Sequence, residues 1–384
     1  MCHVFRLATV STTSLVVLPC QFRLTFGFKP KRHRRRERAN ERLAHMAARG
    51  ALRTIQEGKD VRARSRRRTR RPGERVSRLA VVHAEARGRS LEFKQDVMLS
   101  KHSTWGIGGP AKLFVEIFEP EDMVVVLEES IRRDVPLFVL GRGSNCLFDD
   151  RGFEGIVALN NMSQYQDLGE GKFRVGSGHR FDHLGAKTSK EGWTGLEFAA
   201  GIPGTVGGAV YMNAGANQQK TSDVLVEVEY LDRHGNFHTL KKDQAEFGYR
   251  MSPFQEMLQP VVVTSAVFQL RKCDKSRARV MEYMDRRRQT QPLHEKSAGC
   301  VFRNPGEGHP PVGYLIEHLG MKGLVVGGAS VSHVHGNFLI SKDGCQCSDM
   351  LQLIQNIKAR IKEATGIDLE EEIHYVPPQG FHKP

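Results

Sequence analysis

The sequence predicts an α+β protein of two parts, a larger glycine-rich part and a smaller C-terminal part. Three glycine-rich loops lie at 106–110, 141–145 and 195–215. Glycine has no Cβ and tolerates positive φ, so such loops can place backbone N–H groups against phosphates. Strands and helices alternate around these loops, and the pattern changes after residue 271 to a charged helix and shorter elements. The first part is therefore expected to hold a large, extended, phosphate-containing cofactor.

The basic charge of the chain is concentrated in its first 90 residues. The 384 residues carry a formal net charge of +14. Residues 1–90 contain 24 of the 57 Lys and Arg residues but 6 of the 43 Asp and Glu residues, a net charge of +18 that leaves −4 for the rest. Strong nucleic-acid binding needs a basic face, and membrane spans need about 20 apolar residues. We expect neither nucleic acid nor membrane as a partner of residues 91–384.

Residues 1–90 have the composition of an organellar transit peptide. Ser, Thr and apolar residues at 9–18 precede arginine-rich clusters at 31–38 and 62–71, with few acidic residues. Transit peptides and disordered segments share this composition. A secretory signal is less favoured because the basic cluster follows the apolar segment. An RNA-binding arm and a mispredicted upstream exon remain as alternatives.

Order is expected from residue 91, and the first part is predicted to extend over 91–272. After a loop and strand at 97–116, apolar residues at helical spacing behind an acidic first turn predict a helix over 121–134. A buried strand at 135–140 leads directly into the second glycine-rich loop. The remaining predicted elements of this part are strands at 155–159, 172–176, 224–231 and 260–270 and a helix at 181–191.

The second part, 273–384, begins with a charged helix at 275–289 and a proline-marked turn. The block 300–303 follows, then a helix at 312–319, strands near 324–326 and 336–340, and a helix at 348–366. The apolar residues of the last helix recur at helical spacing, which predicts that they pack in the core.

The seven cysteines indicate a reducing compartment. They form no Cys-x-x-Cys pair and have no histidine at metal-ligand spacing, so no metal site is expected. Cys345 and Cys347 are separated by one residue, which is more typical of surface thiols in a turn than of a ligand pair.

Four blocks, including the third glycine-rich loop, occur in a fixed order along the chain. They are the loop at 195–215, Phe-Gly-Tyr-Arg-Met-Ser at 247–252, Ser-Ala-Gly-Cys-Val-Phe-Arg-Asn-Pro at 297–305 and Leu-Glu-Glu-Glu-Ile at 369–373. Over residues 92–378 they closely resemble the UDP-N-acetylenolpyruvoylglucosamine reductase (MurB) family. The resemblance implies a two-lobed FAD-binding domain of the vanillyl-alcohol-oxidase/PCMH type, followed by a smaller α+β substrate domain.

The same resemblance implies an activity and its partners. Noncovalent FAD would carry hydride from NADPH to UDP-N-acetylglucosamine enolpyruvate, giving UDP-N-acetylmuramate for peptidoglycan synthesis. No loop is inserted between Asn213 and Glu227, which resembles the shorter type of the family that lacks an extra substrate loop. The leader then implies the plastid stroma, with the cytoplasm as the alternative, and a monomer is expected.

Reduction of an enol ether conjugated to a carboxylate needs a cation for the developing negative charge and a proton donor. The resemblance assigns the cation to Arg250, the proton donor to Cys300, where many relatives carry serine, and a third catalytic role to Glu372. A thiol is a stronger acid than a hydroxyl, and its use would make the enzyme sensitive to alkylation. The alternatives are a structural Arg250, an inert thiol at Cys300, and Glu370 in place of Glu372, because the two carboxylates share one face of an expected strand.

The resemblance assigns the binding residues to the loops. For FAD these are Gly106, Gly108, Gly109, Gly141, Gly143, Ser144, Asn145, Gly201, Ile202, Pro203, Gly204, Thr205, Gly207, Gly208 and Ala209. For the UDP-sugar they are Asn213, Gly215, Tyr249, Gln291 and Asn337. The arginine run 286–288 is either a further pyrophosphate contact or a solvated helix face, and His333 and His335 are as well explained as structural histidines.

Two other functions compete with this reading. Another FAD oxidoreductase of the same superfamily, such as a sugar or alcohol oxidase, would share the fold but commonly attaches its flavin covalently through a histidine. A plastid nucleic-acid-associated protein would depend on the basic leader, so a chain starting at residue 90 would lose tight, salt-sensitive RNA binding.

Overall fold

The computed structural model describes residues 81–380, apart from 87, 88 and 258. The predictions for the leader therefore fall mostly outside the described residues. Strand β1 (Val81–Ala86) pairs antiparallel with β2 (Arg89–Lys94), so regular structure begins earlier than the expected residue 91.

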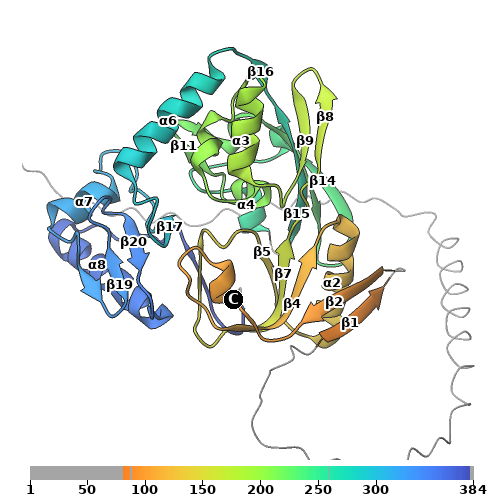
Figure 1. The fold of residues 1–384 in the computed structure, drawn as a ribbon, viewed down its shortest axis with the longest axis horizontal. Helices are drawn as coiled ribbons and strands as arrows, with labels where there is room; N and C mark the ends of the chain where they lie inside the picture. Colours follow the sequence, from red (N-terminus) through yellow and green to blue (C-terminus); the bar gives the residue numbers. More distant parts are fainter. Residues whose placement is uncertain (1–80, 87–88, 258, 381–384) are drawn as a thin grey trace, which may run out of the picture. The chain divides into compact units, whose positions relative to one another are not determined.

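The first lobe is a six-stranded mixed sheet with the order β1-β2-β4-β7-β5, and β3 is also paired with β4. Its other strands are β3 (Val97–Met98), β4 (Pro110–Ile117), β5 (Leu137–Leu140) and β7 (Phe153–Asn160). The predicted helix is α2 (Pro120–Arg133), which begins at a proline and ends at Asp134 in the left-handed conformation. The apolar face of α2 packs in one core with β4 and β7 (Figure 1).

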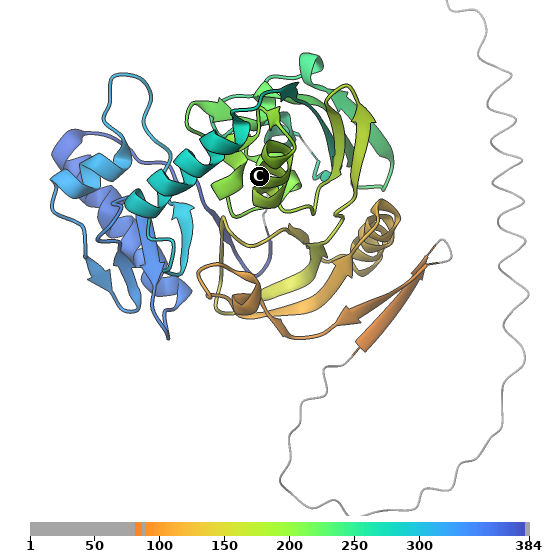
Figure 2. The same cartoon turned by 45° about the horizontal axis from the view of Figure 1, so that its top comes forward.

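The second lobe is an antiparallel sheet with the order β14-β13-β15-β9-β8. Its strands are β8 (Tyr165–Gly169), β9 (Lys172–Gly176), β13 (Leu225–Leu231), β14 (Phe237–Lys241) and β15 (Val262–Gln269). Helix α3 (Phe181–Lys190), the 3-10 helix η2 (Glu197–Gly201) and α4 (Val206–Tyr211) share its core (Figure 2). Strands β8 and β14 are not predicted from the sequence. They lie at the sheet edges and are mostly exposed, so their residues show no apolar pattern.

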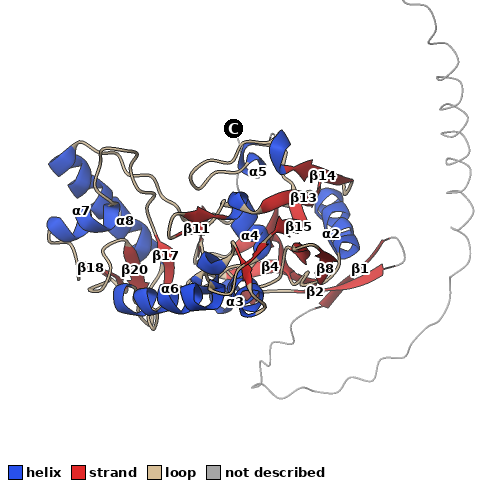
Figure 3. Cartoon of the chain, turned by 90° about the horizontal axis from the view of Figure 1, so that it is seen from above, coloured by secondary structure: helices blue, strands red, loops and turns tan. Residues whose placement is uncertain are grey.

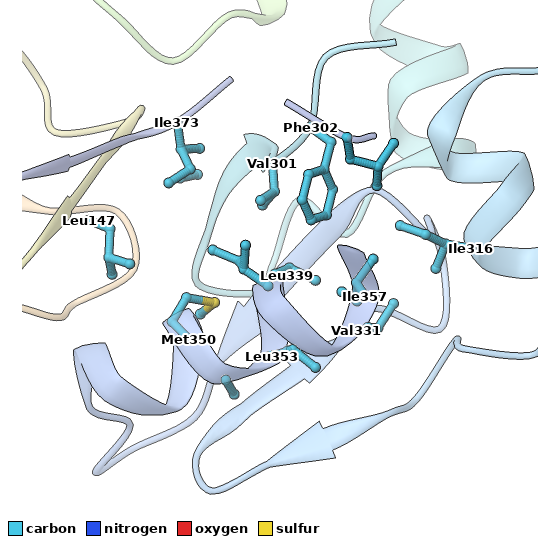
Figure 4. Close-up of a cluster of buried hydrophobic side chains, with 14 of the residues drawn as sticks. Leu147, Val301, Phe302, Ile316, Val331, Leu339, Met350, Leu353, Ile357 and Ile373 are labelled. Atoms are coloured by element: carbon cyan, nitrogen blue, oxygen red, sulfur yellow. The ribbon is translucent and has the colours of Figure 1, made fainter. Parts of the chain in front are cut away.

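The C-terminal part has an antiparallel sheet of order β17-β20-β19-β18 and two helices. The strands are β17 (Ser297–Cys300), β18 (Val325–Val326), β19 (Ala329–Val331) and β20 (Phe338–Ser341), and the helices are α7 (Val312–His318) and α8 (Cys347–Thr365). The apolar residues of α8 are buried, as their spacing predicts, and Met350, Leu353 and Ile357 point into the cluster drawn in Figure 4.

Two connections join this C-terminal part to the lobes. Helix α6 (Ser276–Thr290) packs against η2 and α3 of the second lobe (Figure 3). Strand β21 (His374–Val376) pairs in parallel with β6 (Cys146–Phe148) of the first lobe. Leu147 and Ile373 consequently join the C-terminal core (Figure 4). The predicted segment 273–384 thus sends its last strand back to the first part.

The remaining elements are short. They are η1 (Leu99–His102), β10 (Trp193–Thr194), β11 (Gly215–Ala216), β12 (Gln219–Lys220), η3 (Thr221–Asp223), η4 (Lys242–Gln244), α5 (Pro253–Glu256) and β16 (Arg271–Lys272). Within the described residues, no helix combines the length and apolar character needed to cross a bilayer. The same residues contain no cluster of three or more His, Cys, Asp or Glu side chains suited to a metal ion.

Candidate active site

The three glycine-rich loops meet in the structure. A Cβ added to Gly141 would lie 2.8 Å from Oγ1 of Thr205, and one added to Gly204 would lie 3.7 Å from Oγ of Ser144. The backbone N of Thr104, beside the first loop, donates to the carbonyl of Gly143 at 3.1 Å. Segments far apart in the sequence therefore form one glycine-lined surface.

Two of the predicted cofactor glycines leave open space in front of their backbone. The nearest neighbour of a Cβ on Gly204 or Gly208 is a hydroxyl oxygen 3.7 or 3.6 Å away, which is ordinary contact distance. Gly208 lies in the first turn of helix α4, whose N-cap Thr205 accepts a hydrogen bond from the N–H of Gly208. Pro203 and Gly208 are exposed, and Gly106 is also exposed, whereas Ala209 is buried in α4 and Ile202 packs on the second-lobe core. An open backbone surface of this kind fits the pyrophosphate of a dinucleotide.

Other predicted cofactor residues have a packing reason to be small. A Cβ on Gly109 would lie 2.1 Å from the carbonyl O of Asp150, and one on Gly143 2.0 Å from that of His102. A Cβ added to Gly108 would come too close to the side chain of Phe148, and one added to Gly207 too close to that of Ser177. These glycines shape the loops, and direct contact with a cofactor is not needed to explain them.

Arg250 and Glu372 form an ion pair between two distant segments. Nε of Arg250 lies 2.6 Å from Oε1 of Glu372, with the side chains 19% and 15% exposed. The contact is an ion pair without hydrogen-bond geometry, because Nε of Arg250 has no hydrogen-bond partner among the described residues. Burial raises the pKa of Glu372, and the charge of Arg250 opposes that rise. Arg250 is held at φ 56°, which is unusual for a residue with a side chain.

Cys300 ends strand β17, opposite Phe338 of β20. The pKa of its thiol is raised to about 12, mainly by burial and also by the charge of Glu372, while the charges of Arg250 and Arg287 act to lower it. The three predicted catalytic residues therefore lie close enough for Arg250 and Glu372 to act on the thiol of Cys300. A thiol with this pKa stays protonated at neutral pH, which suits an acid, and a protonated thiol is alkylated slowly. The raised pKa therefore favours slow alkylation over the sensitivity expected from the sequence, and alkylation itself stays a prediction.

Backbone contacts hold Glu372 rather than the expected strand. Residues 370–372 lie before β21, and Glu371 forms an isolated bridge with Phe302. The backbone N of Glu372 donates to the carbonyl of Val301 at 2.7 Å, and Nδ2 of Asn145 donates to the carbonyl of Glu372 at 3.0 Å. Asn145, predicted to bind FAD, thus also fixes the catalytic segment.

The three consecutive glutamates make ion pairs with different basic residues. Glu371 pairs with Lys358 of α8 at 2.8 Å, and the exposed Glu370 lies 3.6 Å from Arg303. Of the three glutamates, Glu372 is the one that contacts Arg250. This geometry favours Glu372 over Glu370 as the site carboxylate.

Two of the predicted substrate residues have side-chain amides engaged within the protein. Nδ2 of Asn213 donates to the carbonyl of Gly248 at 2.7 Å, and its Oδ1 accepts from the N of Ser222. Asn337 bonds both the N and the O of Phe302. Both asparagines are 2% exposed. Their observed contacts position the segments that carry Arg250 and Cys300, and their direct contact with substrate stays a prediction.

The other predicted substrate residues differ in their exposure and in their hydrogen bonding. Gly215 lies in the tight hairpin β11–β12, whose strands are joined by two left-handed residues, Asn217 and Gln218, without an inserted loop. Tyr249 is 56% exposed, and its ring lies 5.3 Å from the guanidinium of Arg250. Gln291 follows α6, and its buried Oε1 has no hydrogen-bond partner among the described residues.

Sequence reasoning missed the contacts made by Glu197 and Arg287. Glu197 is fully buried in η2 and accepts hydrogen bonds from Thr194, Gly195 and Ser276. Arg287 is half-buried beside Gly201, whereas Arg286 and Arg288 are exposed. A glycine pattern cannot indicate which distant side chain will fill the space that the missing Cβ leaves.

The fold and the site define an FAD-dependent oxidoreductase. A family model described as FAD binding domain matches residues 111–241, and one described as UDP-N-acetylenolpyruvoylglucosamine reductase, C-terminal domain, matches residues 291–376. The chain belongs to the UDP-N-acetylenolpyruvoylglucosamine reductase (MurB) family, which uses FAD and NADPH.

Similar proteins cover most of the described part. The UDP-N-acetylenolpyruvoylglucosamine reductase of Protochlamydia amoebophila is 46% identical over 74% of this chain and 94% of its own length. That of Chlamydia trachomatis serovar A is 41% identical over 75% and 97%. The crystal structure of the Thermus caldophilus enzyme has a TM-score of 0.63 at 33% identity, covering 74% of this chain and 99% of that one.

Proposed function

We propose that this protein reduces UDP-N-acetylglucosamine enolpyruvate to UDP-N-acetylmuramate with NADPH. The convergence of Arg250, Cys300 and Glu372 beside the glycine-lined surface is the observation that carries the proposal. FAD, when bound, would supply the hydride-transfer chemistry between NADPH and the vinyl carbon of the substrate. The open space in front of Gly204 and Gly208 would let the pyrophosphate approach the backbone closely.

Arg250 holds the substrate carboxylate in this proposal. Hydride addition places negative charge on the adjacent carbon and on the carboxylate, and a guanidinium can bind the latter through two parallel hydrogen bonds. Because Arg250 is already 2.6 Å from Glu372, its orientation is fixed before the substrate arrives. A fixed cation needs no reorganisation when the charge develops.

Cys300 donates the proton that completes the reduction. Its half-buried thiol remains protonated at neutral pH, so the acid form is available in each turnover. Glu372 acts beside it as the carboxylate that orients Arg250 and assists proton delivery. Its own elevated pKa results from burial, with Arg250 acting in the opposite direction.

A substrate-dependence measurement tests the proposed function. Purified protein loaded with FAD is expected to oxidise NADPH when UDP-N-acetylglucosamine enolpyruvate is present, and to do so slowly without it. Mass spectrometry should show a product heavier than the substrate by two hydrogens. Equal NADPH oxidation with and without the substrate would instead indicate an oxidase or diaphorase. Release of FAD on denaturation tests the noncovalent attachment.

The leader directs the protein to the plastid stroma in the same proposal, and the folded part acts as a monomer without nucleic-acid or membrane partners. The composition of residues 1–90 supports this, and the cytoplasm is the alternative. A fluorescent protein fused behind residues 1–90 should accumulate in plastids, and diffuse cytoplasmic fluorescence would contradict the proposal. Light scattering of the purified protein tests the monomer.

A further inference from the structure

Residues 248–251 form a tight turn whose second central residue is Arg250. The backbone N of Met251 donates to the carbonyl of Gly248 at 3.3 Å, and the N of Gly248 donates to the carbonyl of Met251 at 3.1 Å. Arg250 has φ 56° in this turn, a conformation that usually takes Gly or Asn at this position. An arginine keeps such a conformation where other contacts hold the turn.

The side-chain amide of Gln255 makes one of these contacts. Its Nε2 donates to the carbonyl of Arg250 at 3.1 Å and to the carbonyl of Tyr211 at 2.6 Å. An amide nitrogen has two N–H groups, so one hydrogen can serve each carbonyl. The same nitrogen lies 3.8 Å from Sδ of Met212. Gln255 therefore connects the backbone of Arg250 to a distant segment of the chain.

That segment is the end of helix α4, which contains the predicted cofactor residues 207–209. Tyr211 is the last residue of α4, so its carbonyl lies beyond the hydrogen bonds of the helix. Besides Gln255, the buried hydroxyl of Ser252 donates to this carbonyl at 2.6 Å. Both donors follow Arg250 closely in the sequence, and helix α5, which contains Gln255, lies against α4 (Figure 3).

Contacts with the end of α4 thus hold the turn at two carbonyls. Asn213, two residues beyond α4, donates to the carbonyl of Gly248, and Gln255 joins the carbonyl of Arg250 to that of Tyr211. The orientation of the guanidinium is consequently fixed relative to the helix that begins in the cofactor loop.

We propose that Gln255 is a positioning residue that keeps the guanidinium of Arg250 in register with the cofactor loop. The inference rests on the proposed function and names a further residue for it. Hydride addition requires the vinyl carbon and the carboxylate of the substrate to be held at fixed positions relative to the cofactor. Without the amide of Gln255, Arg250 is free to relax from its strained φ, and its guanidinium then leaves the carboxylate site.

The two half-reactions and amide hydrogen exchange test this role. We compare wild type, Gln255→Met, Gln255→Glu and the control Gln352→Met, which changes an exposed glutamine of α8. Gln255→Met should slow oxidation of reduced FAD by the enolpyruvyl substrate about 10- to 100-fold, as expected for a misplaced binding group. Reduction of FAD by NADPH should be unchanged. Mass spectrometry should show faster hydrogen exchange in the peptide that contains residues 248–251, because the turn opens more often. Gln352→Met should change none of these.

A double-mutant cycle shows whether Gln255 acts through Arg250. In an Arg250→Ala background the guanidinium is absent, so Gln255→Met should slow the reoxidation of FAD little further. Additive effects of the two substitutions would assign Gln255 a general structural role and overturn the proposal.

Two other results would also overturn the proposal, namely unchanged hydrogen exchange at 248–251 or wild-type reoxidation in Gln255→Met. If Gln255→Met fails to fold, Gln255→Glu decides. An ionised carboxylate cannot donate to either carbonyl, so this variant should slow reoxidation at least as much, and a wild-type rate would contradict the proposal. A wild-type enzyme whose reduced FAD is not oxidised by the substrate would instead contradict the proposed function, and hydrogen exchange would still decide whether Gln255 holds the turn.

Discussion

Arg250 shows how much the site depends on the conformation of single residues. Its φ of 56° places the side chain toward Glu372, and its neighbour Gly248 is held by the buried amide of Asn213. A non-glycine residue in this region is strained by of order 1 kcal/mol or more, and such strain persists where surrounding contacts fix it. The blocks around Arg250, Cys300 and Glu372 were visible in the sequence. Their convergence, and the engaged amides of Asn213 and Asn337, were not, because hydrogen-bond partners depend on the tertiary fold.

Arg250→Lys is expected to slow the oxidation of reduced flavin by the enolpyruvyl substrate about 100- to 1000-fold, or about 3–4 kcal/mol. An ammonium cannot reproduce the two parallel hydrogen bonds of a guanidinium. Reduction of FAD by NADPH should be unaffected. Rapid mixing of each half-reaction measures both effects, with the exposed Arg288→Lys as the control. Near-normal reoxidation in Arg250→Lys would assign Arg250 a structural role.

Cys300→Ala is expected to leave NADPH-dependent reduction of FAD intact and to slow its reoxidation by substrate severely. Cys300→Ser should recover much of the rate, since a hydroxyl occupies the position in many relatives.

Because burial raises the thiol pKa to about 12, iodoacetamide should label Cys300 slowly at pH 8, as followed by peptide mapping. Wild-type reoxidation in Cys300→Ala would exclude it as the donor, and Glu372 would be tested next.

At the scale of elements, apolar patterns predict the bounds of helices and strands that bury one face. Strand β9 has the predicted bounds, and α3 differs from its prediction by one residue at its end, because each carries a regular buried face. Helix α4 was hidden inside a glycine-rich run, since its first turn consists of small residues behind Thr205. The pairing of β21 with β6 could not be predicted, because neither three-residue strand has a pattern that identifies its partner.

Glu197→Gln tests the attachment between η2 and α6. Burial acts to raise the pKa of Glu197, and hydrogen bonds from Thr194, Gly195 and Ser276 overcome it, so the pKa is lowered. The charged carboxylate therefore stabilises the fold above the pKa of the unfolded chain, and this stabilisation is lost as pH falls through the folded pKa. The variant should be less stable by about 2–3 kcal/mol at pH 7.

Urea unfolding of wild type, Glu197→Gln and the exposed control Glu282→Gln checks this expectation. The difference in free energy of unfolding between wild type and Glu197→Gln should become smaller at acidic pH, below the usual pKa of a glutamate. A difference that stays constant with pH would mean that the charge of Glu197 is not what stabilises the attachment.

At the scale of the whole molecule, buried thiols link stability to alkaline pH. Burial raises the pKa of Cys146 and Cys347 to about 12. The unfolded chain releases these protons near pH 9 whereas the folded chain keeps them, so stability should fall as pH rises above about 9. We expect a loss of roughly 1 kcal/mol per thiol between pH 8 and 10. Urea unfolding of wild type and of Cys146→Ala and Cys347→Ala at both pH values measures it; equal losses in all three would contradict this origin.

The parallel pairing of β21 with β6 also sets the order in which the enzyme becomes active during synthesis. A ribosome delivers the glycine-rich loops and Arg250 first and Cys300 later, and Glu372 emerges after helix α8. A nascent chain halted before residue 372 contains the residues expected to hold FAD, but it lacks the carboxylate and the strand that closes on the first lobe. Completion of the chain is thereby required before Glu372 can contact Arg250 and before β21 can pair with β6.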